Sequence, residues 1–478
     1  MRRQGELAPA AVAPRPRVTG AWLGCAVVVL VVVVVLRLAY TAWVLTQLER
    51  FCVNGPAGTE VRSPLLDSWL ADNDGVEQLL SATENLAEVT ADRTGVPAMA
   101  MRALAGRPDR LASWRARLCD ETLPAVAGGG LRLAPVASGS VLPGAGSWYL
   151  ARASAVRQLG PWLGLLAWEA LERGDQAEAL RIVWAQLWLG EGLTDRRLPA
   201  LSIVARAVGY RVLVEAGTTL LAMAPALALE AWEARILDRR LADLETRVVS
   251  AQEACAAERD AIASLPLLLA AFDADPRLRQ QTGYQEPLQP LRFALGSTGQ
   301  VRAGLDPVWR LMAQPLGEPH WAARVTAWDR SDNDLRQLHG EQIPVRVVLR
   351  GLWSPGGAVR GWLAAYGLPD LHRVELQWRR AVLWLRAMRV ALALVAWRTE
   401  VGGWPSDLAA LAAWYRLPLP EDPFGDAPFR CGRGAPPVFY SVGADGSDSG
   451  GRSGPFNESG RDIWLWPPWP ADDTSRGG

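Results

Sequence analysis

One apolar segment near the N-terminus constrains this chain more than any other feature. Residues 18–36 read VTGAWLGCAVVVLVVVVVL without a charge, and largely apolar sequence continues past Arg37 as far as Leu45. A helix rises about 1.5 Å per residue, so this segment can span a hydrocarbon core of about 30 Å. The valines favour a strand, but a lone segment in lipid must satisfy its backbone hydrogen bonds internally. We therefore predict a transmembrane helix over 18–45 behind a cytoplasmic tail over 1–17.

The flanks of this segment predict its orientation. Arginines precede it at positions 2, 3, 15 and 17, and aromatic residues suited to a membrane interface lie at positions 22, 40 and 43. This pattern puts the N-terminus in the cytoplasm. We expect a single-pass protein of the inner (cytoplasmic) membrane, with the bulk of the chain periplasmic or extracellular. Cleavage of the segment as a signal peptide and lipid attachment at Cys25 are the alternatives.

Charge balance argues against one class of partner. The 478-residue chain has 50 basic residues, all of them arginine, and 50 acidic residues. A nucleic-acid-binding protein would show a basic excess, so we expect no nucleic acid among the partners. The expected partners are the membrane, through the single span, and a protein at the cell envelope. The sequence does not indicate a small-molecule substrate.

Four cysteines follow the predicted span, at positions 52, 119, 255 and 431. An even number in an oxidising compartment allows two disulfides in any of three connectivities. Unpaired thiols that behave as small apolar side chains are an equal alternative. None of the spacings is typical of a metal site.

Beyond the anchor, the sequence predicts a mainly α-helical ectodomain followed by a small α+β domain. Leu166, Ala170, Gly174–Asp175 and Ala179 have the spacing of a tetratricopeptide-like helical hairpin, with a second hairpin suggested across 198–223. Either an apolar helical core or a peptide-binding groove would use this pattern. The predicted regions are a helical region with a Gly/Pro-rich linker (46–149), the helical-hairpin region (150–265), an irregular Pro/Gly/Trp-rich region with short helices (266–370) and the C-terminal domain (371–470).

A charged amphipathic helix is expected over 235–263, with its acidic and basic residues on a solvated face. The three histidines lie farther along, at positions 320, 339 and 372. His339 with Glu341 could form an acid–base or metal pair, although isolated loop residues of this kind are usually exposed surface. The sequence contains no Ser-His-Asp order, phosphate-binding glycine loop or zinc signature, so we predict a protein that is not an enzyme.

The last fifth of the chain carries an ordered set of local signals. A helix over 371–400 is predicted to be buried along most of its girth, because its few charges form narrow stripes on an otherwise apolar surface. Trp404–Pro405 ends it, and Ser406 or Asp407 caps a short helix over 408–415. A turn is expected over 422–425. Short strands are expected over 429–431, 438–441 and 463–466.

Four of these pieces, in order, resemble the C-terminal domain of the major pseudopilin of type II secretion systems. They are Gly-Gly-Trp-Pro (402–405), Asp-Pro-Phe-Gly (422–425), Ser-Val-Gly-Ala-Asp-Gly (441–446) and Asp-Ile (462–463). The resemblance covers roughly residues 371–466 and implies a spine helix on which a small antiparallel sheet packs. It does not extend to the N-terminus, where no Gly-x-x-x-x-x-Glu processing site of a prepilin precedes the span.

The resemblance also implies a calcium site in the loop 443–462. Calcium binds six to eight oxygens, and aspartates separated by glycines allow carboxylates and carbonyls to turn toward one ion. The expected ligands are the side chains of Asp445, Asp448 and Asp462 and the carbonyl of Val442, with Asn457 and Glu458 to complete the shell. A Gly/Asp/Ser turn that needs no ion is the alternative.

These expectations define a membrane-anchored exocytoplasmic protein with a structural or assembly role, which the resemblance links to type II secretion. A peptide- or protein-binding helical-repeat module at the cell envelope is the second reading, and an exported hydrolase is the third. An exposed apolar helix over 371–400 would favour assembly. A Trp-lined groove in the helical region would favour binding.

Overall fold

The computed structural model describes residues 31–46, 163–196, 203–274, 289–339, 370–432, 438–452 and 462–466, together with residues 160 and 357. Positions 37, 41, 44, 45 and 426 are excepted from these ranges. The cytoplasmic tail, most of the region 46–149, Cys25, Cys52 and Cys119 lie outside them. In the described part, the chain is mainly helical, with a few short strands near its C-terminus.

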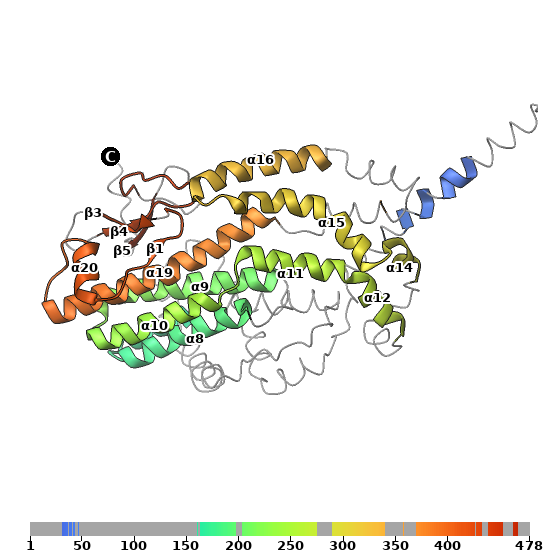
Figure 1. Cartoon of the computed structure of the whole chain (residues 1–478). Coiled ribbons are helices and arrows are strands. Elements are labelled where there is room, and N and C mark those ends of the chain that lie inside the picture. The colour runs from blue at the N-terminus through green and yellow to red at the C-terminus, as the bar shows by residue number, and fades with distance from the viewer. Residues whose placement is uncertain are drawn as a thin grey trace, which may run out of the picture.

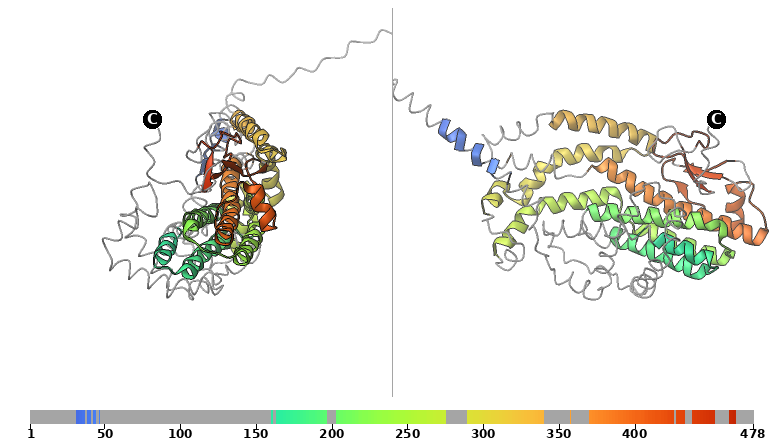
Figure 2. Two further views of the ribbon diagram at one scale, coloured as in Figure 1. Left: turned by 90° about the vertical axis from the view of Figure 1, so that its left-hand side faces the viewer. Right: turned by 180° about the vertical axis from the view of Figure 1, so that it is seen from behind.

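The described helices form an elongated bundle around one central helix, α19 (Leu371–Val401). Helices α8 to α11 cover one side of α19, and α15 and α16 cover the other (Figure 1). Figure 2 shows the same arrangement from behind and along the bundle. The bounds of the covering helices are α8 Gln176–Thr194, α9 Ile203–Met223, α10 Ala231–Arg247, α11 Ala251–Ala263, α12 Leu265–Ala274, α14 Gln289–Leu295, α15 Thr298–Ala313 and α16 Trp321–His339.

The predicted helical hairpin is confirmed at its turn. A helix over 163–172 ends at Gly174, whose positive φ of 80° suits glycine. Asp175 donates its backbone N–H to the Ala170 carbonyl at 2.9 Å, and its side chain caps α8 by accepting from the N–H of Glu178 at 3.0 Å. The Gly-Asp pair therefore both stops one helix and starts the next.

The second hairpin predicted across 198–223 is instead the single helix α9. Two glycines that were not part of the predicted hairpin pattern allow α8 and α9 to pack closely. A Cβ atom on Gly209 would lie 2.6 Å from the Thr194 side chain and 3.0 Å from the Gly190 carbonyl, and one on Gly190 would lie 2.7 Å from Leu213. The α8–α9 crossing thus depends on paired glycines inside two continuous helices.

The single helix predicted over 235–263 is divided in two. Residues 248–250 separate α10 from α11, and Ser250 starts α11 with a capping box. Its hydroxyl accepts from the N–H of Glu253 at 3.2 Å, while the Glu253 carboxylate accepts from the N–H of Ser250 at 3.0 Å. These two reciprocal hydrogen bonds start a new helix inside the stretch that was predicted to be one amphipathic helix.

Part of the charged face predicted to be solvated points toward α19 instead. Asp238 is 4% exposed and pairs with Arg389 at 2.6 Å, and Glu245 pairs with Arg386 at 2.8 Å. The arginines belong to the charged stripe that the sequence shows on α19. Asp238 and Glu245 of α10 are therefore the partners of two arginines in that stripe.

The region 266–370 was predicted to have irregular connections with short helices, and its described residues are mostly helical. Helices α12, α14, α15 and α16 occupy most of its described residues. Each is a separate helix because turns interrupt the apolar period: Gly296 has a φ of 76°, and a short 3₁₀ turn at Gln314–Gly317 joins α15 to α16. Ser297 caps α15 with a second capping box.

Helix α19 confirms the prediction of a long helix buried along most of its girth. It has 31 residues, about 46 Å at 1.5 Å per residue. Its C-terminal turn is fastened to the start of α10, where Glu400 accepts the N–H of Ala231 at 2.7 Å and Arg398 donates to the Leu227 carbonyl at 2.8 Å. The helix ends at Gly402, with a φ of 80°, two residues before the predicted Trp404–Pro405 stop.

The predicted C-terminal elements are present within one residue of their expected bounds. Asp407 caps α20 (Leu408–Tyr415) by accepting from the N–H of Ala410 at 2.7 Å. Strands β3 (Arg430–Gly432), β4 (Val438–Ser441) and β5 (Ile463–Trp466) form an antiparallel sheet in the order β3-β4-β5. The sequence did not predict the two-residue pair β1 (Glu421–Asp422) and β2 (Ala427–Pro428). We call the part from α20 to β5 the C-terminal module.

The C-terminal module and the helical bundle share one hydrophobic core. A single cluster of buried residues runs from Leu163 through α8–α16 and α19 to Leu465 of β5. Among the described cysteines, Cys255 is buried in this cluster and Cys431 is half-buried in β3, and both are free thiols. Burial raises the pKa of the Cys255 thiol to about 12, which makes this cysteine unreactive at neutral pH.

Two apolar helices bear on the predicted membrane span. The short helix Val31–Tyr40 belongs to the predicted anchor, and the side chains of Val31, Val33 and Leu36 are exposed. In the described residues, only the stretch Arg206–Ala226 is long and apolar enough by itself to cross a membrane. Since 67% of that stretch is buried inside the molecule, its composition suits a core helix equally well.

Candidate functional site

The candidate site is the loop that follows β4, together with the turn that supports it. The turn over 422–425 is organised by Asp422, which is 3% exposed. One carboxylate oxygen accepts from the N–H of Phe424 at 3.0 Å and the hydroxyl of Ser441 at 2.8 Å, and the other accepts from the N–H of Val442 at 2.9 Å. Burial raises the pKa of Asp422, and these hydrogen bonds oppose the rise. Asp422 thus ties the turn to the end of β4, where the loop begins.

The first half of the loop is built from tight turns. Gly443 and Gly446 both have positive φ, and the N–H of Gly446 donates to the Gly443 carbonyl at 3.1 Å. Asp445 is half-buried and accepts from the N–H of Ser447 at 3.0 Å. This local bond is the usual role of an aspartate in a turn and requires no ion.

Asp448 lies on the exposed side of the loop. Its Oδ1 accepts from the N–H of Gly450 at 2.9 Å and from the hydroxyl of Tyr440 at 3.3 Å. Its Oδ2 lies 3.5 Å from Nε of Arg430 on β3. Both side-chain partners come from the sheet, so Asp448 holds the loop against it.

Asp462 closes the loop from the other side. It is fully buried, and its two carboxylate oxygens accept from the N–H groups of Ser449 at 3.1 Å and Gly451 at 2.6 Å. Burial raises the pKa of Asp462, and the nearby charges of Asp448 and Asp445 raise it further, whereas the two N–H groups oppose the rise. The three aspartates are therefore near enough for their charges to interact.

This geometry bears on the predicted calcium ligands residue by residue. Asp445, Asp448 and Asp462 lie in one loop, and the backbone N–H of Val442 donates to Asp422. Asn457 and Glu458 lie outside the described residues. Within the part of the chain that the structure describes, no group of three His, Cys, Asp or Glu side chains is placed to hold a metal. The donors suit calcium in kind, although Oδ1 of Asp448 already accepts two hydrogen bonds, from Gly450 and Tyr440.

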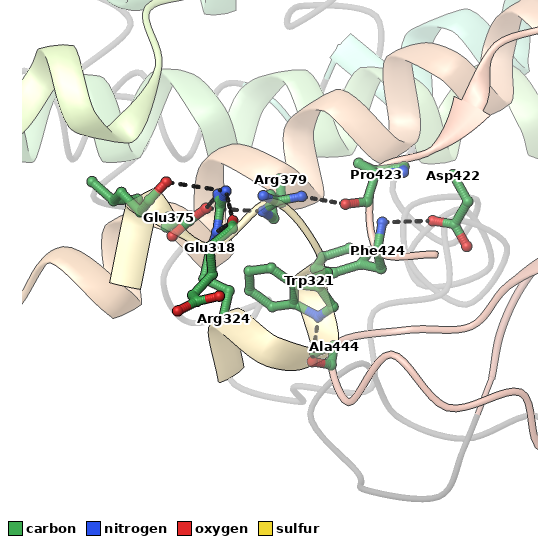
Figure 3. Close-up of polar contacts among 10 residues, drawn as sticks. Glu318, Trp321, Arg324, Glu375, Arg379, Asp422, Pro423, Phe424 and Ala444 are labelled. Carbon is green, nitrogen blue, oxygen red and sulfur yellow. Dashed lines mark hydrogen bonds and ion pairs between the residues drawn. The ribbon is translucent and has the colours of Figure 1, made fainter. Parts of the chain in front are cut away.

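The loop is docked on α16 through one tryptophan. Trp321 is 1% exposed, and its Nε1 donates to the Ala444 carbonyl at 2.8 Å (Figure 3). Its ring meets that of Phe424 edge-on, with centroids 5.3 Å apart. A Cβ atom on Gly446 would lie 3.1 Å from the same indole. Trp321 therefore contacts both the 422–425 turn and the candidate loop.

A buried charge cluster lies beside Trp321, at the start of α19. Glu375 is 1% exposed, and its Oε1 accepts from Arg324 at 2.7 Å and from Arg379 at 3.0 Å (Figure 3). Arg379 also donates to the Pro423 carbonyl and lies over the Trp321 ring, with 4.4 Å between the guanidinium carbon and the ring centroid. We call Arg324, Glu375 and Arg379 the docking cluster, because they join α16, α19 and the 422–425 turn.

The loop could be predicted from the sequence, but the residues of α16 that support it could not. The charged stripe on α19, which includes Glu375 and Arg379, was visible in the sequence. Nothing local indicated that Trp321 or Arg324 would meet it, since both lie in the stretch predicted to be irregular.

The structure does not support a histidine site among the described residues. His372 stacks on Trp328 at 5.3 Å between centroids, with 9° between the planes. His339 is the last residue of α16, and Glu341 lies outside the described residues. Cys255, the buried thiol, is protonated at neutral pH.

Comparisons of this chain with known protein families, with curated proteins and with solved structures give no significant match.

Proposed function

We propose that the chain is a membrane-anchored protein of the cell envelope whose helical bundle carries a pseudopilin-like module with a structural or assembly role. One observation supports this most. The apolar N-terminal helix lies at one end of the bundle, and the C-terminal module lies at the other (Figures 1 and 2). An anchor at 18–45 would therefore hold the module away from the membrane.

Helix α19 gives this arrangement its rigidity. It extends along the bundle and contributes both to the bundle core and to the surface on which β1 and α20 pack. The apolar face of α19 is covered by helices of the same chain. Assembly through an exposed spine is therefore not what we propose; contacts with other molecules would use the loop after β4 and the outer side of the sheet.

The candidate loop gives the proposed module a means of control. Three aspartates at 445, 448 and 462 interact electrostatically, and a calcium ion would relieve their repulsion. In this proposal, the ion rigidifies the loop after β4, which is part of the surface that a partner would contact. The loop sits on Trp321, so its order would be transmitted to α16.

Topology is the direct test of this proposal. A fusion of alkaline phosphatase to the C-terminus is expected to be active, because that enzyme requires disulfides that form only outside the cytoplasm. The fusion should stay with the membrane during a carbonate wash. An inactive fusion with an active cytoplasmic reporter would contradict the orientation, and release of a shortened soluble chain would show a cleaved signal.

A second candidate function is supported by exposed aromatic residues on the side of the bundle. Trp188 of α8 is 40% exposed, and Trp232 and Ile236 of α10 are 57% and 43% exposed. Such residues are typical of protein-binding surfaces. If the side of α10 that carries Trp232 and Ile236 binds a protein, a photoreactive benzoylphenylalanine at position 232 should cross-link to a discrete second protein in cells, whereas the same residue at Asp334 on α16 should not. The absence of adducts at position 232 would exclude this function.

A further inference from the structure

The two most exposed large apolar side chains in the described residues lie on two helices that pack against each other. Phe293 of α14 is 84% exposed and Leu267 of α12 is 65% exposed. Helices α12 and α14 pack against each other, so both side chains belong to one end of the bundle. An aromatic ring that is more than four-fifths exposed contributes nothing to the core of this chain and suggests an external contact.

Helix α12 is unusually apolar for a helix at the surface. Its sequence is LPLLLAAFDA, with one charge in ten residues. Leu265 and Leu269 are buried in the core cluster, whereas Leu267, between them, faces outward. Among the described side chains of α12, Leu267 is therefore an apolar residue on the outer face. In α14, exposed Arg292 precedes Phe293, so a positive charge accompanies the exposed ring.

The position of α12 and α14 in the bundle indicates which surface they contact. They lie at the end of the bundle where the helix over 31–46 is found, and the views in Figures 1 and 2 agree on this. Tyr40 of that helix packs against the core cluster and stacks on Trp43 at 6.3 Å between centroids. A tyrosine and a tryptophan at the end of an apolar helix are typical of the membrane interface.

We infer that the α12–α14 end of the bundle is a second membrane contact, with Leu267 and Phe293 inserted at the boundary between lipid headgroups and acyl chains. Apolar side chains with an adjacent arginine are the features of interfacial segments that lie in this boundary. Arg292 would remain at the level of the lipid phosphates. The occupant is the lipid bilayer itself. The inference rests on the proposed anchor, which brings this end of the bundle to the membrane.

A second membrane contact would restrict how the bundle tilts about its anchor. One helix leaves a tethered domain free to tilt, whereas a helix plus an inserted patch fixes two points of the bundle on the bilayer. The bundle would then stand away from the membrane with α19 directed outward. The C-terminal module would be held at a defined height.

Lipid photo-cross-linking of the full chain tests this inference. Benzoylphenylalanine replaces Phe293 in one variant, Leu267 in a second and Trp232 in a control that is also aromatic and exposed. After carbonate washing and irradiation of the membranes, peptides are analysed by mass spectrometry for lipid adducts. Adducts are expected at 293 and 267 and not at 232. Two exposed test positions guard against a folding defect in one of them, and a melting curve like that of the wild type shows that each variant is folded.

The outcomes separate this inference from the proposed anchor. A chain lost from the membrane in the carbonate wash overturns both. A chain that stays in the membrane without lipid adducts at 293 and 267 overturns the membrane contact alone. Protein adducts at these two positions instead of lipid adducts would also overturn it and would assign the patch to a protein partner.

Discussion

Glu375 shows how much of this fold depends on single charges. The sequence displays the stripe on α19 that includes Glu375 and Arg379, but it does not show which way the stripe faces. The structure buries Glu375 between two arginines, one from its own helix and one from α16. A pattern within one helix could be predicted because helical geometry fixes it. The partner across the core could not, because it depends on tertiary packing.

Removing the Glu375 carboxylate should be costly. The Glu375→Ala change would leave Arg324 and Arg379 close together at a buried position without their shared anion, and the loss of one partner of a buried pair costs about 3 to 5 kcal/mol. The free energy of unfolding, measured by urea titration of the full chain in detergent, should fall by this order. Glu318→Ala is the matched control, because Glu318 accepts the hydrogen bond from Arg324 through its backbone carbonyl, which the substitution keeps. This substitution should change the free energy of unfolding by less than about 0.5 kcal/mol. Equal effects of the two changes would contradict a special role for the docking cluster.

At the scale of elements, closely packed helices were the part that the sequence predicted best. The Gly174–Asp175 turn before α8 was predicted correctly, and the caps at Asp175 and Asp407 were visible as local signals. The bounds and lengths of the helices within 266–370 could not be predicted in the same way. Their individual periods are short and change phase at Gly296 and at the 3₁₀ turn, so no sustained pattern crosses them.

Two glycines in helices provide a matched test of close packing. Gly209→Ala would place a methyl group 2.6 Å from Thr194 and 3.0 Å from a backbone carbonyl, so we expect a loss of about 1 to 3 kcal/mol despite the better helix propensity of alanine. In α15, a Cβ atom on Gly299 meets nothing closer than 3.8 Å. Gly299→Ala should therefore be neutral or stabilise by up to about 1 kcal/mol. Thermal melting measures both changes, and a stabilising Gly209→Ala would show that the α8–α9 crossing has more space than described.

The candidate loop allows a sharper calcium test than removing its most buried aspartate. Asp462 accepts two backbone N–H groups, so Asp462→Ala should destabilise the loop with or without an ion. Asp448 is exposed and better suited to separate the two roles. If calcium binds, the full chain should gain about 2.7 kcal/mol at a free concentration of one hundred times Kd, and Asp448→Asn should reduce this gain.

The control for calcium is Asp334→Asn, an exposed change on α16 far along the chain from the loop. Differential scanning calorimetry in calcium and in chelator supplies the measurement. Identical curves for the unmodified chain in both conditions would establish the loop as a turn that needs no ion.

At the scale of the whole molecule, the shared core determines which parts of the chain can fold separately. The sequence placed a boundary at residue 371, before a domain that would pack its sheet on its own helix. The structure gives α19 a second set of neighbours, α9, α10 and α11, within the same hydrophobic cluster. A boundary inferred from a local resemblance could not show this, because the resemblance contains no information on the preceding 370 residues.

Two truncations test the role of α19. A chain that ends at residue 402 keeps the complete helix and should retain a cooperative, helical unfolding transition, with reduced stability because Phe424 no longer covers Trp321. A chain that ends at residue 370 lacks the centre of the bundle and should lose cooperative unfolding. Circular dichroism at increasing temperature distinguishes the two. Cooperative unfolding of the shorter chain would show that the outer helices form a core without α19.

The late position of α19 in the chain also determines when the protein can mature. Helices α8 to α11 are synthesised before residue 264, but the helix they surround is complete only at Val401. At about 5 to 20 residues per second, the ribosome needs roughly seven to thirty seconds to cover that interval. Throughout it, the nascent helices have apolar faces and no centre to bury them. A chain exported through the proposed anchor would have to stay unfolded until it has crossed the membrane, and the late synthesis of α19 would delay completion of the core until near the end of translation.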